Sequence, residues 1–147
     1  MTSMTQATDA TRSTPVGFGT LVGQALLGGA AAAVVNLVVF YGGRAAGVPF
    51  TGEFQPGTLS ELPVPPIVIS SLLPGVIGAA VALAFQKFTT RAARNFALLA
   101  AGFTVVSFVG PVNVPQISTG SAVLMNVMHA VAALGIGGML YRALKRG

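Results

Sequence analysis

The chain has 147 residues, of which 53% are hydrophobic and 7% are charged, and its formal net charge is +5. Soluble domains carry about 25% charged residues, so this composition excludes an ordinary water-soluble globule. The lack of cysteine excludes disulfides, thiol redox chemistry and iron–sulfur clusters held by this chain. Nucleic acid is not an expected partner, because the basic residues flank apolar runs and therefore suit membrane anchoring.

Charged side chains are missing from three long stretches of the sequence. Residues 13–43, 62–86 and 95–141 contain no Asp, Glu, Lys or Arg. These stretches hold four apolar runs, and a helix of about 20 apolar residues is long enough to cross the hydrocarbon layer of a bilayer. The sequence therefore predicts an all-α, membrane-embedded four-helix bundle that forms a single transmembrane domain over residues 16–147.

The first predicted span covers residues 18–41 and follows a polar tail. Residues 1–15 are rich in Ser and Thr and lack periodicity, which predicts a disordered tail. A cleavable signal peptide is excluded, because the apolar run continues through residues 34–40 and is too long for a signal core. The loop over residues 42–66 contains five prolines, which disfavour a regular helix, and its apolar side chains predict that it folds onto the bundle or the interface.

Proline and serine mark the boundaries of the other three spans. Pro65 and Pro66 open the second span, residues 67–85, since proline suits a first helical turn. Pro74 lies inside this span and predicts a kink. The third span, residues 95–112, ends at Pro111, and Ser121 is expected to cap the fourth span, residues 121–141.

Basic residues at the ends of the spans predict how the chain is threaded. With four spans, both termini and the connection between the second and third spans lie on one side of the membrane. Basic residues favour the cytoplasmic side, so both termini are expected in the cytoplasm of a plasma-membrane protein. Seven basic residues lie on this side, namely Arg12, Lys87, Arg91, Arg94, Arg142, Lys145 and Arg146, against Arg44 on the other.

Small residues recur at four-residue spacing within the spans. Spans in lipid associate through close packing, which such residues allow. This pattern predicts a tight bundle with little room for a wide aqueous pore inside one protomer. The pairs are Gly19–Gly23, Gly28–Ala32, Gly29–Ala33, Gly75–Ala79, Gly78–Ala82, Ala97–Ala101 and Ala133–Gly137.

The polar residues inside the spans supply the candidate site. His129 is the only histidine of the chain, and Asn126 lies three residues earlier on the same helical face. Asn36 of the first span can reach either of them. Three interpretations remain open: hydrogen bonds between helices, a small-molecule or lipid-headgroup site, and axial ligation of haem with a second histidine from another subunit.

Several function classes lack the groups that they require. No buried carboxylate is present for ion coupling, and no buried arginine for voltage sensing. No Ser/His/Asp set, phosphate loop or His-rich metal motif is present either, so the sequence predicts no catalytic residues, no metal ligands and no resident cofactor.

Two short motifs carry a resemblance to a known family. Residues 107–111 form a Ser-x-x-x-Pro element, and the fourth span contains the dipeptide Met128-His129. Together with the Pro-rich loop and the basic middle turn, they resemble a family of small uncharacterised bacterial membrane proteins with four helices, over residues 21–142. The resemblance implies fold and location but no reaction, and it adds Ser107 and Pro111 to His129 as candidate ligand-binding positions.

The leading functional expectation is a non-enzymatic membrane protein. It would assemble with itself or with a membrane partner protein, or it would bind an apolar, lipid-like ligand. The alternative is a transporter or channel component whose path is lined by His129, and a haem-binding protein is third.

Overall fold

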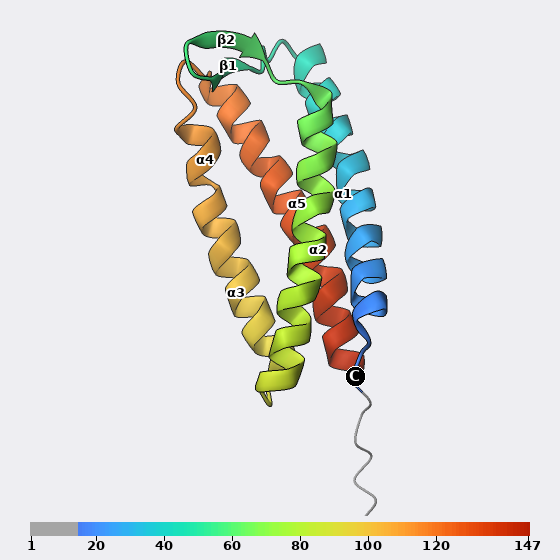
Figure 1. The fold of residues 1–147 in the computed structure, drawn as a ribbon. Coiled ribbons are helices and arrows are strands. Elements are labelled where there is room, and N and C mark those ends of the chain that lie inside the picture. The colour runs from blue at the N-terminus through green and yellow to red at the C-terminus, as the bar shows by residue number, and fades with distance from the viewer. Residues whose placement is uncertain (1–14) are drawn as a thin grey trace, which may run out of the picture.

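The computed structural model describes residues 15–147, and four of its helical segments are long and apolar enough to cross a membrane (Figure 1). The prediction of an all-α, four-helix membrane bundle is confirmed. The predicted disordered tail lies, apart from Pro15, outside the described residues. The elements are α1 (Phe18–Ala45), β1 (Thr51–Gln55), β2 (Thr58–Glu61), α2 (Val64–Phe88), α3 (Ala92–Ser107), α4 (Val109–Val112) and α5 (Thr119–Arg146).

Three of the helices, α1, α2 and α5, are longer than the apolar runs predict. The helices α1 and α5 each have 28 residues. At 1.5 Å per residue they are about 42 Å long, whereas the hydrocarbon core is about 30 Å thick. Helical hydrogen bonding continues beyond the apolar segment, so hydropathy alone placed the ends of the spans too close together.

Proline affects α2 and the third span differently. The third span breaks at Phe108 into α3 and the short α4. Pro111 has no N–H to donate to the carbonyl of Ser107, four residues before it, and the helix ends at that serine. Pro74 removes the equivalent bond to Ser70, yet α2 continues through it as one helix.

The connection predicted as a loop over residues 42–66 is shorter than expected and contains regular structure. The helix α1 continues to Ala45, and β1 and β2 form an antiparallel hairpin that pairs Thr51 with Glu61. Its turn places Gly57 at a φ of +73°, a region that favours glycine. Prolines flank the two strands but do not lie within them, and the pairing shifts its register between Gly52 and Gln55.

The hairpin is tied to the end of the bundle through Phe50. This residue is 1% exposed and lies at a φ of +47°. Its N–H donates to Ser121 Oγ at 3.1 Å, and its carbonyl accepts from the N–H of Leu62 at 2.8 Å. The N–H of Glu53 donates to the carbonyl of Pro115 at 2.9 Å, which joins β1 to the loop before α5.

The N-cap of α5 is Ser118, not Ser121 as expected. Ser118 Oγ accepts from the N–H of Ser121 at 3.1 Å. Helix α5 begins at Thr119, so Ser121 lies in its first turn, where its side chain is fully buried and binds Phe50. The sequence correctly indicated that a serine caps α5. It could not show that Ser121 would instead accept a hydrogen bond from Phe50, beside the hairpin.

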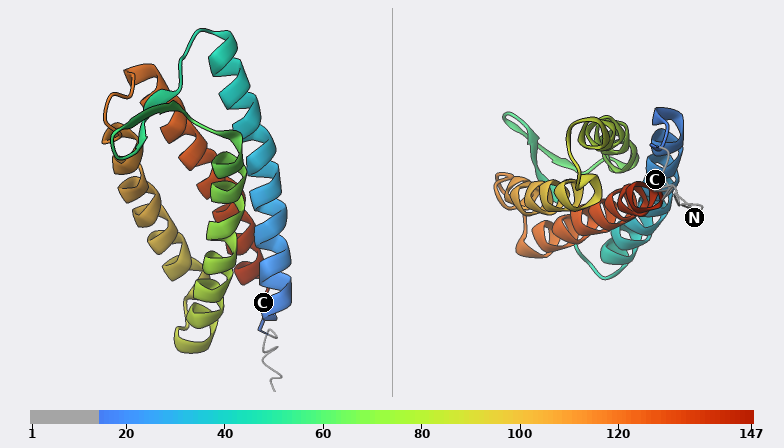
Figure 2. Two further views of the ribbon diagram at one scale, coloured as in Figure 1. Left: turned by 45° about the horizontal axis from the view of Figure 1, so that its top comes forward. Right: turned by 90° about the horizontal axis from the view of Figure 1, so that it is seen from below.

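Glycines bring α1 against both α5 and α2. A Cβ atom added at Gly135 would lie 2.6 Å from the carbonyl oxygen of Gly28, and one added at Gly29 would lie 2.6 Å from that of Ser71. Seen along the bundle, α5 lies between α1 and α3 (Figure 2). The small pairs at residues 28–33 therefore make helix contacts, whereas Gly19 and Gly23 have no atom near their Cβ positions.

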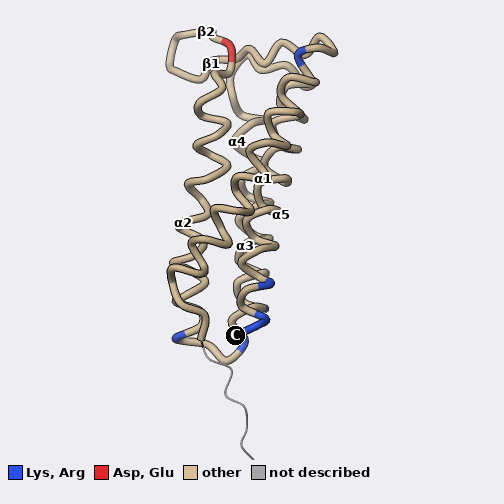
Figure 3. The backbone as a smooth tube through the Cα atoms, turned by 90° about the vertical axis from the view of Figure 1, so that its right-hand side faces the viewer, with Lys and Arg blue, Asp and Glu red and all other residues tan. Residues whose placement is uncertain are grey.

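Charge separates the two ends of the bundle (Figure 3). We call the end that carries β1 and β2 the hairpin end and the opposite one the basic end. Among the described basic residues, only Arg44 lies at the hairpin end, where it pairs with Glu61 at 3.1 Å. Large apolar side chains are exposed along the flanks between these ends, as in a multi-pass membrane protein.

Candidate ligand-binding site

A groove runs between α2, α3 and α5 on one flank of the bundle. Its volume is about 330 Å³, which falls within the range of roughly 300–1,000 Å³ that small-molecule sites occupy. Side chains at its margins are exposed on the flank, including Ile77 of α2 and Phe103 of α3. The groove is therefore open toward the lipid that surrounds the bundle.

The wall of the groove is apolar at one end and carries polar groups at the other. Toward the basic end it is formed by Val81, Phe96 and Ile136. From Ser70 to Val81 the wall follows α2 for eleven residues, about 16 Å. The polar side chains gather toward the hairpin end, and they are Ser70, Thr104, Ser107 and His129.

Small residues on α3 and α5 create the hollow. Ala100 of α3 faces α5, where Ala132, Ala133 and Gly137 line the floor of the groove. A Cβ atom added at Gly137 would lie 4.0 Å from that of Ala100, at the outer limit of van der Waals contact. The predicted pair Ala133–Gly137 thus lines a cavity, whereas the glycines of α1 close a contact.

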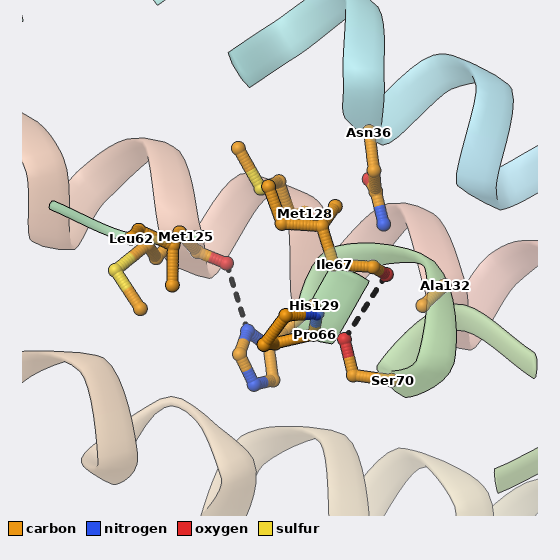
Figure 4. Close-up of a pocket in the computed structure, with 9 residues that line it drawn as sticks. All are labelled: Asn36, Leu62, Pro66, Ile67, Ser70, Met125, Met128, His129 and Ala132. Carbon is orange, nitrogen blue, oxygen red and sulfur yellow. Dashed lines mark hydrogen bonds between the residues drawn. The ribbon is translucent and has the colours of Figure 1, made fainter. Parts of the chain in front are cut away.

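His129 lies at the polar end of the groove with a defined proton arrangement. Its Nδ1 lies 2.8 Å from the carbonyl oxygen of Met125. A carbonyl oxygen can only accept, so this contact assigns a proton to Nδ1 and, in the neutral ring, leaves Nε2 as an acceptor. Figure 4 shows the second ring nitrogen pointing away from Met125. The hydrogen bond of His129 is made within α5, so the first interpretation, hydrogen bonds between helices, fails for His129 but holds for Asn36, which donates to Ser71 of α2.

A second, smaller cavity lies between α1, α2 and α5 (Figure 4). We call it the chamber. Its volume is about 160 Å³, and it shares Ser70, His129 and Ala132 with the groove. Asn36 contributes from α1, so the structure brings Asn36 and His129 to one cavity, as the sequence allowed.

The amide of Asn36 has one satisfied end and one unsatisfied end. Ser71 Oγ gives its proton to the carbonyl of Ile67 at 2.8 Å, so it can only accept from Asn36 Nδ2, which lies 3.0 Å away. This fixes the orientation of the amide. Asn36 is 3% exposed, and its Oδ1 has no hydrogen-bond partner within the described residues. A buried acceptor without a partner is costly.

The structure does not bring the other two candidates to this site. Asn126 lines neither cavity, and its buried Oδ1 also has no partner among residues 15–147. Pro111 is buried in α4 and lines neither cavity. Ser107, in contrast, lies at the polar end of the groove with His129.

In the comparison with known families, residues 16–146 match a family of unknown function, DUF6069. The chain belongs to this family. No curated protein and no solved structure gives a significant match. The predicted resemblance to an uncharacterised family of four-helix membrane proteins is therefore confirmed, and membership of DUF6069 assigns no activity.

Sequence reasoning missed one half of the site in this DUF6069 chain. Ser107 was selected for its Ser-x-x-x-Pro element, yet Ser70 and Pro74 form the same element in α2. Both serines line the polar end of the groove, one from each wall. The repeated Ser-x-x-x-Pro motif is the signal in the sequence that points to Ser70 as well as to Ser107.

Proposed function

We propose that the protein binds a lipid-like ligand in the groove between α2, α3 and α5. The observation that carries this proposal is the shape and chemistry of the groove. The wall is about 16 Å long, is apolar toward the basic end and carries a small set of polar groups toward the hairpin end, and one side is open to lipid. A lipid matches this groove, because its apolar chain would lie along the apolar wall and its polar head would lie beside the polar groups.

The proposed role is binding without catalysis. The hydroxyl protons of Ser70, Thr104 and Ser107 are all directed to carbonyl oxygens of their own helices. No pair of a nucleophile and a base therefore forms among them. Binding and release of a membrane-soluble molecule need only the groove itself.

We also propose that the basic end faces the cytoplasm and that the membrane is the plasma membrane of a bacterium. Basic residues gather at the end where α5 terminates and where α2 turns into α3. Such segments are retained on the cytoplasmic side. In this orientation the polar end of the groove lies toward the outer leaflet.

Native mass spectrometry tests the proposed binding. The protein is purified in native lipid, transferred to detergent and weighed intact. We expect one retained ligand of lipid mass per protomer, which Ala133→Phe removes because the new ring fills the groove. Ala31→Phe is the matched control, since Ala31 is exposed on α1 and lines neither cavity.

A second groove variant, Ala100→Leu, fills the groove with a smaller side chain and keeps the test valid if Ala133→Phe misfolds. The proposal is overturned if the wild type retains no stoichiometric ligand. It is also overturned if folded groove variants retain the ligand as well as Ala31→Phe does. Fragmentation of the released ligand identifies its chain and its head group.

A further inference from the structure

We infer that the groove selects an uncharged lipid whose head donates hydrogen bonds, namely a long-chain alcohol. This inference rests on the proposed function and deepens it, because it names the chemistry of the ligand's polar end. It is carried by the direction of every proton that the structure assigns at the polar end of the groove.

The three hydroxyl groups of the polar end have already used their protons. Thr104 Oγ1 lies 2.7 Å from the carbonyl oxygen of Ala100, and Ser107 Oγ lies 2.7 Å from that of Thr104. Ser70 Oγ lies 3.2 Å from the carbonyl oxygen of Ile67 (Figure 4). A carbonyl can only accept, so each hydroxyl donates within its own helix and offers lone pairs to any further partner.

His129 adds an acceptor to this set. Its Nδ1 proton is used by the carbonyl of Met125, so in the neutral ring the lone pair on Nε2 is available. Nε2 can accept a hydrogen bond from the hydroxyl group of a ligand. Its single lone pair lies in the plane of the ring, so the direction of this bond is better defined than that of a bond to a serine oxygen.

The two Ser-x-x-x-Pro elements add backbone acceptors at the same end. Pro74 and Pro111 cannot supply the helical N–H that would bind the carbonyls of Ser70 and Ser107. In a membrane, carbonyls released in this way need partners from neighbouring groups or from a ligand. Both serines whose carbonyls lose this helical donor line the polar end of the groove.

Charge excludes the other common lipid heads. Among residues 15–147, no Asp, Glu, Lys or Arg lines the groove. A carboxylate or phosphate would find acceptors and no donor, and an ammonium head would be desolvated without a counter-ion. A hydroxyl group supplies one donor without charge, which matches what the groove offers.

Tryptophan fluorescence tests this inference directly. The chain has no tryptophan, so Leu99→Trp at the margin of the groove introduces a single reporter. Three mid-chain dibrominated C12 lipids are compared in nanodiscs: the alcohol, its methyl ether and the carboxylate at pH 8. We expect saturable quenching by the alcohol, with an affinity about tenfold above that of the ether, the effect of about one hydrogen bond.

Variants of His129 separate its acceptor role from a structural role. His129→Leu is expected to reduce the alcohol-to-ether ratio to within about twofold. His129→Gln can donate to Met125 through its amide nitrogen and present its amide oxygen, so it is expected to keep most of the ratio. A Leu27→Trp reporter on α1, away from both cavities, is expected to show only non-saturable quenching.

The outcomes distinguish this inference from the proposed function. Equal binding of alcohol and ether, or carboxylate binding as tight as that of the alcohol, overturns the head-group inference and leaves lipid binding in place. Non-saturable quenching by all three lipids at Leu99→Trp overturns both. An unchanged ratio in His129→Leu overturns the assignment of Nε2 as the acceptor.

Discussion

Asn36 and Ser71 share one hydrogen bond but are expected to respond differently to substitution. Ser71→Ala removes the acceptor of Asn36 Nδ2 and leaves both ends of the buried amide unpaired. We expect the free energy of unfolding to fall by about 1–3 kcal/mol. Asn36→Leu removes the unpaired Oδ1 together with the bond, so stability is expected to stay level or rise. Reversible unfolding in mixed micelles measures both, and similar losses in the two variants would contradict the assigned amide orientation.

Gly135 is predicted to be the most sensitive small residue of α5. An added Cβ would meet the backbone oxygen of Gly28 at 2.6 Å, and a backbone atom cannot move aside as a side chain does. Gly135→Ala is expected to cost about 1–3 kcal/mol of stability and to lower the melting temperature in detergent. Gly138→Ala is the control on the same helix, because nothing lies within 4 Å of its Cβ position. Equal melting temperatures for the two variants would show that α1 and α5 are not packed this closely.

Single residues were predictable from the sequence where their chemistry was rare. His129 is the only histidine, and its place in an apolar run identified it as a site candidate. Ser70 did not stand out, because a serine in a span is usually bonded to its own helix, as it is here. Its importance depends on Ser107 lying across the groove, and that relation exists only after α2 and α3 have packed.

Among the elements, the hairpin is predicted to depend on one buried ring. Phe50 packs its ring 4.8 Å from that of Phe40, and its backbone holds both Ser121 and Leu62. Phe50→Ala is expected to lower stability by about 3–5 kcal/mol and to loosen the hairpin. Limited digestion with thermolysin should then cut residues 46–63. Leu59→Ala is the control, since Leu59 is exposed, and equal cutting of both variants would refute the anchoring role of Phe50.

The sequence predicted the existence of the spans better than their ends. Apolar length reports which residues can lie in hydrocarbon, and this identified all four spans. Helix ends depend instead on local hydrogen bonding, such as the cap at Ser118 and the break before Pro111. The hairpin was missed because its strands are short, and prolines close to both of them favoured an irregular loop.

For the whole molecule, the distribution of charge predicts the orientation in the membrane. The chain has no cysteine, so single cysteines can be introduced directly. Ser60→Cys in β2 and Thr90→Cys between α2 and α3 report the two ends. In intact cells, a membrane-impermeant maleimide is expected to label Ser60→Cys and to reach Thr90→Cys only after lysis. The reverse pattern would invert the proposed threading.

The groove itself could not be predicted, because it is a property of three helices together. Small residues of α5 close a contact with α1 at Gly135 and line the groove toward α3 at Ala133 and Gly137. A small residue of α5 makes a close helix contact where it faces a backbone carbonyl, as at Gly28, and lines the groove where it faces another small side chain, as at Ala100. A single sequence does not specify that pairing.

The opening of the groove on the flank determines which ligand concentration sets its occupancy. Ile77 and Phe103 border it, and both are exposed where acyl chains surround the bundle. A molecule entering there comes from the bilayer, so occupancy follows its mole fraction in lipid and not its concentration in buffer. Adding empty vesicles would draw ligand off the protein, while diluting the sample with water would change little. A ligand that is poorly soluble in water would therefore still reach the groove.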